Sequence, residues 1–147
     1  MPNVAEIMTT DVQVIGPQET LQLAAQLMDQ LDVGSLPVCD GRRLLGMVTD
    51  RDITVRGTAA GLAPDEACVS DVMSTGTEWC TEDQDTEEVM RQMGYAQVRR
   101  LPVINTNREL VGIVSLGDLA TKQPGPVDQA VREISEPSEP DAGPASS

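Results

Sequence analysis

Two short segments of the chain place a hydroxyl and a carboxylate at the same spacing. Thr49 stands three residues before Asp52, and Ser115 stands three residues before Asp118, each pair at the end of an apolar run. A helix that begins at such a point presents unpaired N–H groups and partial positive charge, which suit a phosphate. The hydroxyl can hydrogen-bond that phosphate, and the carboxylate can accept from both vicinal hydroxyls of a ribose. The pattern therefore indicates a binding site for a phosphorylated nucleoside.

The same residues also have a purely structural interpretation. Thr-x-x-Asp at a strand-to-helix junction is close to a capping box, and an Asp in the first turn complements the helix dipole. One isolated copy would favour capping, whereas two copies in matching surroundings favour binding. Gly46 and Gly112 precede the hydroxyls by three residues. A glycine at that point lets another backbone or a flat base approach closely.

The motif is part of an internal repeat that runs through most of the chain. Residues 4–10, 36–40 and 46–53 recur as residues 69–75, 101–105 and 112–119, in the same order. The second copies follow 65 or 66 residues after the first, and chance similarity would not keep that register.

Each repeat predicts the order strand, helix, strand, strand, helix. In the first, a strand is expected at 12–14, and a helix from Thr20 to Gly34 carries the apolar stripe Leu21, Ala24, Met28 and Leu31. Strands at 36–39 and 44–49 flank a turn at Asp40-Gly41, and a helix begins near residue 50. The second repeat predicts strands at 78–81, 101–104 and 110–115, with helices at 86–95 and from about 117.

These elements suggest two repeats, at residues 4–60 and 69–123, joined by a linker at 61–68. Neither repeat alone has enough apolar surface for a stable domain, so we expect the two to pack face to face. Residues 124–147 form an acidic, Pro-rich tail. Within it, the spacing of Val127, Ala130, Val131 and Ile134 predicts a short helix over 127–134.

The composition excludes several classes of function. The 147 residues carry 24 acidic and 10 basic side chains, a formal charge of −14, which argues against nucleic acid or an anionic membrane as partner. The chain has no His, and it shows no nucleophile–base pair, so we expect no catalytic activity and no metal. The three Cys form no disulfide pattern, and no leader or membrane-length apolar run is evident, so we expect a cytoplasmic protein.

The combined pattern resembles the CBS domain, here as a tandem pair. The resemblance covers about residues 4–122 and rests on "EIMTTDV", "LPVCDGRRLLGMVTDRDI", "DVMSTG" and "RRLPVINTNRELVGIVSLGDL". Through "TDRDI" followed by "GTAAGLAP", the chain is also similar to standalone bacterial proteins of the hypoxic-response type. The resemblance implies a mixed α/β (α+β) fold of two β-α-β-β-α repeats with pseudo-twofold symmetry. It further implies clefts for AMP, ADP, ATP or S-adenosylmethionine, no required cofactor, and a homodimer built through helices.

For the second repeat, the resemblance assigns Asp118 to the ribose hydroxyls and places Ser115 near the phosphate. Arg99 and Arg100 stand where family members often place phosphate-binding cations. The remaining expected pocket residues are the apolar Val98 and Ile113 beside adenine, with Trp79 as a weaker candidate. Arg99 and Arg100 can also be a solvated pair that offsets nearby acids, and Trp79 can be a core or dimer residue.

For the first repeat, the resemblance gives Asp52 and Thr49 the ribose and phosphate roles, with Val33 and Met47 beside the base. Gly34 and Ser35 stand where the second repeat has its two arginines. Compensating charge would have to come from Arg51, Arg56 or the other repeat. We therefore expect the second-repeat site to bind a phosphorylated ligand more tightly.

Two interpretations of function follow. In the first, the chain is a non-catalytic sensor whose adenosyl ligand binds between the repeats and changes the geometry of a dimer or of an unidentified protein partner. In the second, it is an interaction or dimerisation scaffold whose pockets are vestigial and whose Asp residues only cap helices.

The acids Glu78, Glu82, Asp83, Asp85, Glu87 and Glu88 indicate a solvated face and favourable charge at a helix N-terminus.

Overall fold

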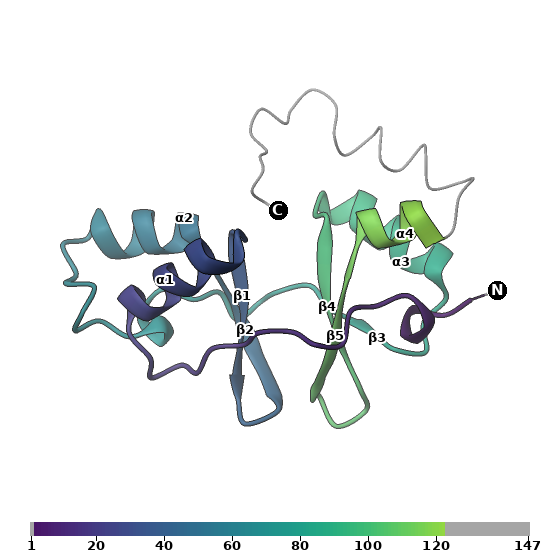
Figure 1. Ribbon diagram of the computed structural model, residues 1–147, viewed down its shortest axis with the longest axis horizontal. Coiled ribbons are helices and arrows are strands. Elements are labelled where there is room, and N and C mark those ends of the chain that lie inside the picture. The colour runs from purple at the N-terminus through teal and green to yellow at the C-terminus, as the bar shows by residue number, and fades with distance from the viewer. Residues whose placement is uncertain (1, 123–147) are drawn as a thin grey trace. The chain divides into compact units, whose positions relative to one another are not determined.

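The computed structural model describes residues 2–122 (Figure 1). Their elements, in chain order, are α1 (Leu21–Leu31), β1 (Ser35–Asp40), β2 (Arg43–Thr49), α2 (Asp50–Asp52), β3 (Cys80–Thr81), α3 (Thr86–Ala96), β4 (Arg100–Ile104), β5 (Leu110–Ser115) and α4 (Leu116–Lys122). A π-helical segment, Ile53–Thr58, continues α2. This mixture of helices and strands confirms the expected fold class. The acidic tail and its expected helix at 127–134 lie outside the described residues.

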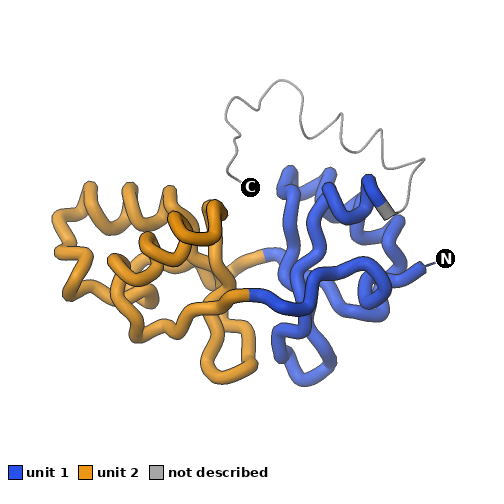
Figure 2. Tube along the Cα trace, in the orientation of Figure 1, with its two compact units in different colours: residues 1–12, 78–140 blue, residues 13–77, 141–147 orange. Residues whose placement is uncertain are grey.

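The described residues form two compact units, which Figure 2 distinguishes by colour. Unit 1 combines residues 2–12 with residues 78–122, and unit 2 comprises residues 13–77. The units therefore do not coincide with the two sequence repeats. The opening segment of each repeat belongs to the unit that is otherwise built from the other repeat. No helix among residues 2–122 has the length and apolar character needed to cross a bilayer.

Unit 1 is built on a three-stranded sheet in the order β3-β4-β5. Strand β3 runs parallel to β4, and β4 is antiparallel to β5. Helix α3 begins where the Asp85 side chain accepts a hydrogen bond from the Glu87 amide, and it ends at Gln97 in the left-handed region. Its buried side chains pack with those of the sheet, α4 and the N-terminal segment in a core of Val4, Ile7, Cys80, Val89, Met90, Met93, Leu101, Val103, Val114, Leu116 and Leu119.

Unit 2 contains the antiparallel hairpin β1-β2, whose two-residue turn includes Gly41 at a φ of 65°. Thr20 caps α1 by accepting from the Leu23 amide, as the sequence predicts. Two expectations for this helix were wrong. It ends at Leu31 and not at Gly34, because Asp32 adopts the left-handed conformation. Leu31 is 45% exposed, so it does not belong to the buried stripe.

The strand expected at 12–14 is also absent from the described residues. In its place the structure has a single parallel bridge between Ile15 and Val38. Ile15 is 3% exposed, so the core-facing residue lies just outside the expected strand. Pro17 follows almost at once, and a residue without an N–H cannot extend a ladder. The corresponding strand of unit 1, expected at 78–81, is reduced to Cys80–Thr81.

The opening segments of both repeats dock on their units in the same way. Thr9 and Ile113 exchange backbone hydrogen bonds of 2.8 and 2.9 Å in unit 1, and Met47 and Ser74 exchange bonds of 3.0 and 2.9 Å in unit 2. A Cβ added to Gly112 would lie 2.8 Å from the Thr9 carbonyl oxygen, and one added to Gly46 would collide with the corresponding oxygen of Ser74. These glycines therefore admit a second backbone, the first of the two roles expected for them.

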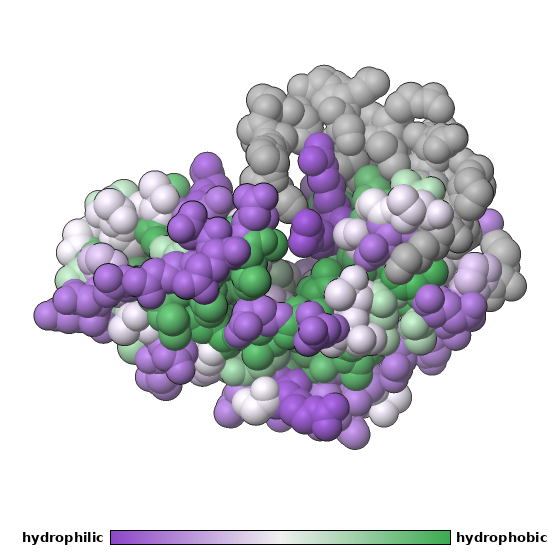
Figure 3. Space-filling view, viewed as in Figure 1, coloured by the Kyte–Doolittle hydropathy of each residue, from purple (hydrophilic) through white to green (hydrophobic). Residues whose placement is uncertain are grey.

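Large hydrophobic side chains reach the surface of both units. On the face drawn in Figure 3, hydrophobic residues (green) lie between groups of hydrophilic ones (purple). The exposed members are Leu31, Val55 and Leu62 in unit 2 and Trp79 and Tyr95 in unit 1. Tyr95 is the extreme case, because 93% of its surface is accessible.

Candidate functional site

The hydroxyl and the carboxylate of each motif form a reciprocal pair at a helix start. In unit 1, the Asp118 amide donates to Ser115 Oγ at 3.0 Å, and the Ser115 amide donates to Asp118 Oδ2 at 3.1 Å. In unit 2, the same two bonds join Thr49 and Asp52, both at 3.0 Å. The capping interpretation is therefore correct as a description of the geometry.

Capping leaves half of each carboxylate available. The cap uses Oδ2 of Asp118 and of Asp52, and Oδ1 of each makes no hydrogen bond with any residue from 2 to 122. Both Asp residues are only half-buried, so solvent or a ligand can reach them. Because the cap also fixes the side chain, Oδ1 is held in one orientation, which favours a ligand that offers hydroxyl donors.

Strand register brings several of the predicted residues of unit 1 to one face of its sheet. Arg100 pairs with Ser115, and Pro102 pairs with Ile113. Cross-strand partners share a face, and alternate residues on a strand do too, so Arg100, Ile113 and Ser115 lie on the face opposite the core. Trp79 directly precedes the fully buried Cys80, just before β3 begins.

Charge is concentrated at the end of this face. Burial lowers the pKa of the Arg100 guanidinium, and the nearby carboxylate of Asp118 acts in the opposite direction. The Arg99 carbonyl accepts from the Leu116 amide at 2.8 Å, which fixes the start of β4 beside the start of α4. A guanidinium, a hydroxyl and a half-used carboxylate are thus close neighbours within unit 1. This set suits a phosphate ester of a sugar.

The two apolar candidates and Trp79 have identifiable surroundings. The Val98 amide donates to the Met93 carbonyl at 3.1 Å, so Val98 follows directly on the end of α3, where it packs against the core of unit 1. The Trp79 ring has a cation partner, because the Arg108 guanidinium lies 5.6 Å from the ring centroid. Trp79 is 38% exposed, so it is not a core residue.

Unit 2 repeats this arrangement without its cations. Ser35 pairs with Thr49, as Arg100 pairs with Ser115. The Gly34 carbonyl accepts from the Asp50 amide at 3.0 Å, which corresponds to the bond of the Arg99 carbonyl. The register therefore shows that Gly34 and Ser35 occupy the positions of the arginine pair. Pro37 pairs with Met47, which is half-buried, and Val33 packs against the core of unit 2.

The two basic residues that could compensate in unit 2 are placed differently. The Arg56 guanidinium donates to the Val72 carbonyl at 3.3 Å, so it is engaged by the docked segment that opens the second repeat. Arg51 lies in α2 and is exposed.

The two buried thiols, Cys39 and Cys80, are unsuited to nucleophilic chemistry. Cys39 and Cys80 are buried, and burial raises the pKa of the first to about 11 and of the second to about 12. Both therefore stay protonated at neutral pH. Within residues 2–122, no group of three or more His, Cys, Asp and Glu is placed to hold a metal ion.

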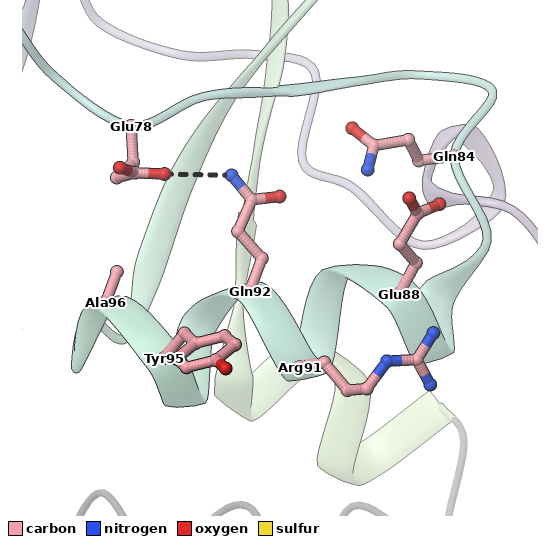
Figure 4. A pocket seen from close by; sticks show the side chains of 7 residues that line it. All are labelled: Glu78, Gln84, Glu88, Arg91, Gln92, Tyr95 and Ala96. Carbon is pink, nitrogen blue, oxygen red and sulfur yellow. Dashed lines mark hydrogen bonds between the residues drawn. The ribbon is translucent and has the colours of Figure 1, made fainter.

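One hollow was not anticipated from the sequence. It lies on the outer side of α3 and is lined by Glu78, Gln84, Glu88, Arg91, Gln92, Tyr95 and Ala96 (Figure 4). Tyr95 falls within the expected helix but outside the stripe of Val89, Met90 and Met93, and this offset is the one signal in the sequence that could have indicated its exposure.

Comparison with known proteins agrees with the internal repeat. The sequence pattern of the CBS domain matches residues 4–56 and again residues 69–125. Hypoxic response protein 1 of Mycobacterium tuberculosis is 42% identical over 125 residues, which cover 84% of this chain and 87% of that protein. A crystal structure of Hypoxic Response Protein I with two coordinated zinc ions has a TM-score of 0.75 at 41% identity, covering 83% of this chain and 99% of the other.

A more distant structure shares the fold. CBSX2, crystallised in complex with AMP, has a TM-score of 0.73 at 24% identity, covering 83% of this chain and 96% of the other. Two matches to one family pattern, the repeated strand register and the shared fold lead to the same result. The chain belongs to the CBS domain family, as a tandem CBS pair.

Proposed function

We propose that this CBS pair is a non-catalytic regulatory module that binds an adenine nucleotide or a related adenosyl compound. The observation that carries the proposal is the arrangement in unit 1. Among residues 2–122, one oxygen of Asp118 has no hydrogen-bond partner while the cap fixes its orientation, and Arg100 and Ser115 are close to it on paired strands. A ribose on the free oxygen would direct a 5′-phosphate toward the hydroxyl and the guanidinium.

The choice of an adenine nucleotide is supported by the fold. CBSX2, which shares the fold, was crystallised with AMP. Ile113 would supply an apolar surface for a base on the side of the sheet that carries Arg100. Val98, which follows the end of α3, packs against the core of unit 1 and would border the base from there. AMP, ADP, ATP and S-adenosylmethionine share the adenosine part, so the groups beyond the ribose decide among them.

The two units are proposed to bind unequally. Unit 2 retains the capped Asp52 with its free oxygen and the Thr49 hydroxyl, but a serine stands where unit 1 has Arg100. Hydrogen bonds to charged groups contribute about 1.5–3 kcal/mol each, against about 1 for neutral ones. A phosphorylated ligand should therefore favour unit 1, whereas an uncharged adenosine moiety should discriminate less.

Binding would act on a partner or a second copy through linkage. A ligand present at about 100 times its Kd stabilises the binding-competent state by about 2.7 kcal/mol. In unit 1 the effect would begin at Ser115, where β5 passes directly into α4, and at the bridge between Thr9 and Ile113 on the same strand. The affinity of a dimer partner or of another protein that contacts these helices would then depend on the ligand.

A second candidate function, a scaffold with vestigial pockets, is favoured by one observation. Both Asp residues form complete caps without any ligand, so capping alone gives each of them a structural role. In that case nucleotides would leave the protein unchanged, and the helices alone would serve a dimer or a partner.

The residues described in this chain do not provide a site like that of the zinc ions in the Hypoxic Response Protein I structure. The sequence has no His, and residues 2–122 contain no cluster of three potential ligands. A tetrahedral zinc site needs three or four such side chains at about 2 Å from the ion. We therefore assign zinc no role in the proposed function.

Thermal shift assays with AMP, ADP, ATP and S-adenosylmethionine test the proposal. The internal repeat supplies the key variant, since Arg100→Ser gives unit 1 the residue that unit 2 carries at its matching position. We expect Arg100→Ser to reduce the shift caused by a phosphorylated ligand. Arg42→Ser, which removes the same charge from an exposed turn, should leave the shift unchanged. If no compound shifts the wild-type transition at millimolar concentration, the scaffold function is the correct one.

A further inference from the structure

The outer side of α3 has a hollow whose lining residues take no part in the candidate nucleotide site. Its volume is about 610 Å³. Binding pockets commonly measure about 300–1,000 Å³. Tyr95 stands at its edge with 93% of its surface exposed (Figure 4). Its own unit does not bury this aromatic ring, and Tyr is enriched at protein–protein interfaces. The hollow is therefore a surface on which another molecule can dock.

One end of the hollow is arranged for a cation. The Gln92 side-chain amide donates to Glu78 Oε1 at 3.2 Å and to the Trp79 carbonyl at 2.9 Å, which holds the Glu78 carboxylate beside α3. Oε2 of Glu78 accepts no hydrogen bond from any residue between 2 and 122. The Tyr95 ring lies at the same end of the hollow as Glu78 (Figure 4). A free carboxylate oxygen near an aromatic ring can bind a guanidinium, through a charged hydrogen bond and a cation–π contact.

The other end of the hollow carries mixed charge. Glu88 and Arg91 lie there, and the Arg91 side chain points toward the N-terminal end of α3, away from Glu78 and Tyr95 (Figure 4). Neither Glu88 nor Arg91 forms a hydrogen bond or ion pair with any residue from 2 to 122. A single cation at the Glu78 end avoids Arg91, whereas an unbroken run of cations would be repelled by it. The hollow therefore favours one Arg or Lys side chain with uncharged residues beside it.

The internal repeat shows that the negative charge around the hollow is not required by the fold. Residues 78–88 contain six acids and no Lys or Arg, whereas the matching residues 13–23 of the first repeat contain one acid, Glu19. Helix α1 nevertheless begins with a regular cap at Thr20, as α3 does at Asp85. The additional acids give this part of unit 1 a negative potential, which attracts a basic partner and speeds its approach.

We propose that the hollow binds an exposed Arg side chain in a basic segment of another protein, with the guanidinium between the Glu78 carboxylate and the Tyr95 ring. Arg fits better than Lys because its planar guanidinium can stack on a ring while it hydrogen-bonds a carboxylate. A second copy of this chain is a poorer occupant, since two chains of formal charge −14 repel each other. The inference goes beyond the proposed function, because it concerns other residues and needs no bound nucleotide.

Heteronuclear NMR titration of the full chain with the peptide acetyl-Arg-Gly-Arg-Gly-Arg-amide, at low ionic strength, tests the proposal. We expect saturable shifts of the Gln92 side-chain amide and of the Tyr95 backbone amide. Glu78→Gln and Tyr95→Leu should each weaken binding about threefold or more, because each removes an ion pair or a cation–π contact at an exposed site. Glu66→Gln, which removes an exposed carboxylate from unit 2, is the matched control and should leave the Kd unchanged.

Absence of saturable shifts overturns the proposal, and so does a Tyr95→Leu variant that binds the peptide like the wild type. Equal loss of affinity in Glu66→Gln and Glu78→Gln also overturns it, because general charge attraction then explains the binding. A Lys peptide that binds as tightly overturns the assignment to Arg, and spermine that shifts the same amides as tightly overturns the assignment to a protein segment. Neither Glu78→Gln nor Tyr95→Leu should change the thermal shift with AMP, which separates this proposal from the proposed function.

Discussion

Replacement of Gly46 by Ala tests how the opening segment of the second repeat is held on unit 2. The added Cβ would collide with the carbonyl oxygen of Ser74, and the carbon atoms of the same peptide lie just over 3 Å away, at 3.1 and 3.2 Å. These are backbone atoms, which cannot swing aside as the end of a side chain can. The docked segment must therefore retreat from β2.

The cost can be worked from the contacts that are lost. The retreat breaks two backbone hydrogen bonds, from Met47 to Ser74 at 3.0 Å and from Ser74 to Met47 at 2.9 Å. Each contributes about 0.5–1.5 kcal/mol, and overpacking in a tight contact costs about 1–3 kcal/mol. Losing both bonds or overpacking the contact each costs about 1–3 kcal/mol, and the two are alternative responses of the segment, so we expect Gly46→Ala to destabilise unit 2 by about 1–3 kcal/mol.

Urea unfolding followed by circular dichroism measures this loss. Gly76→Ala is the matched control, because nothing lies within 4 Å of a Cβ at that position and its φ is not positive. The control should change stability by no more than about 0.5 kcal/mol. Equal unfolding midpoints for the two variants would refute the reasoning, since the segment would then not lie against Gly46 as described.

Three further predictions concern the thiols and the cap. In the native protein, a thiol reagent should modify the half-buried Cys68 first, and Cys39 and Cys80 should react only once denaturant exposes them. Burial raises the pKa of Cys39 to about 11 and of Cys80 to about 12, whereas unfolded thiols titrate near 9.0, so their contribution to stability is complete below pH 9 and is lost as pH rises toward 11 to 12. Urea midpoints should then fall as the pH rises from 9 toward 11, more steeply than in a variant with both thiols replaced by alanine. Asp118→Ala removes one of the two bonds of the cap, from the Ser115 amide to the carboxylate, and should cost about 1 kcal/mol, whereas Asp118→Asn keeps an acceptor and should cost less in the same assay.

Local patterns in the sequence predict most of the elements in both units. Thr20 and the stripe that includes Leu21 and Met28 indicate α1, and the helix expected at 86–95 is α3, one residue longer. The turn at Gly41 also forms between β1 and β2. These features depend on neighbours a few residues apart, which is the range that periodicity, capping and turn chemistry describe.

Features that depend on distant contacts could not be predicted in the same way. The exchange of opening segments between the repeats joins residues far apart in sequence, such as Thr9 and Ile113. The similarity of the two repeats also gives no sign that their first strands differ: Ile15 makes a single bridge in unit 2, whereas unit 1 has the short strand β3. Gly46 and Gly112 could have admitted either a backbone or a base, and the position of the docked segments shows that each admits a backbone.

In the candidate site, too, the sequence predicts local features but not those that depend on the folded structure. Alignment of the two repeats makes Arg100 of the second equivalent to Ser35 of the first, and the strand register agrees with that alignment. Sequence reasoning treated capping and ligand binding by Asp118 as competing roles. The structure places capping on one oxygen of the carboxylate, and we propose ligand binding at the other; no pattern of residue types distinguishes two oxygens of the same side chain.

Isothermal titration calorimetry with AMP, on the wild-type chain and on Asp118→Asn, tests the central claim most directly. Asn at this position keeps the cap but loses the charge that a ribose would use, and charged acceptors contribute about 1.5–3 kcal/mol. The account predicts saturable binding to the wild-type chain and an affinity at least about tenfold lower for Asp118→Asn. Equal affinities, or no heat of binding in either protein, would contradict it.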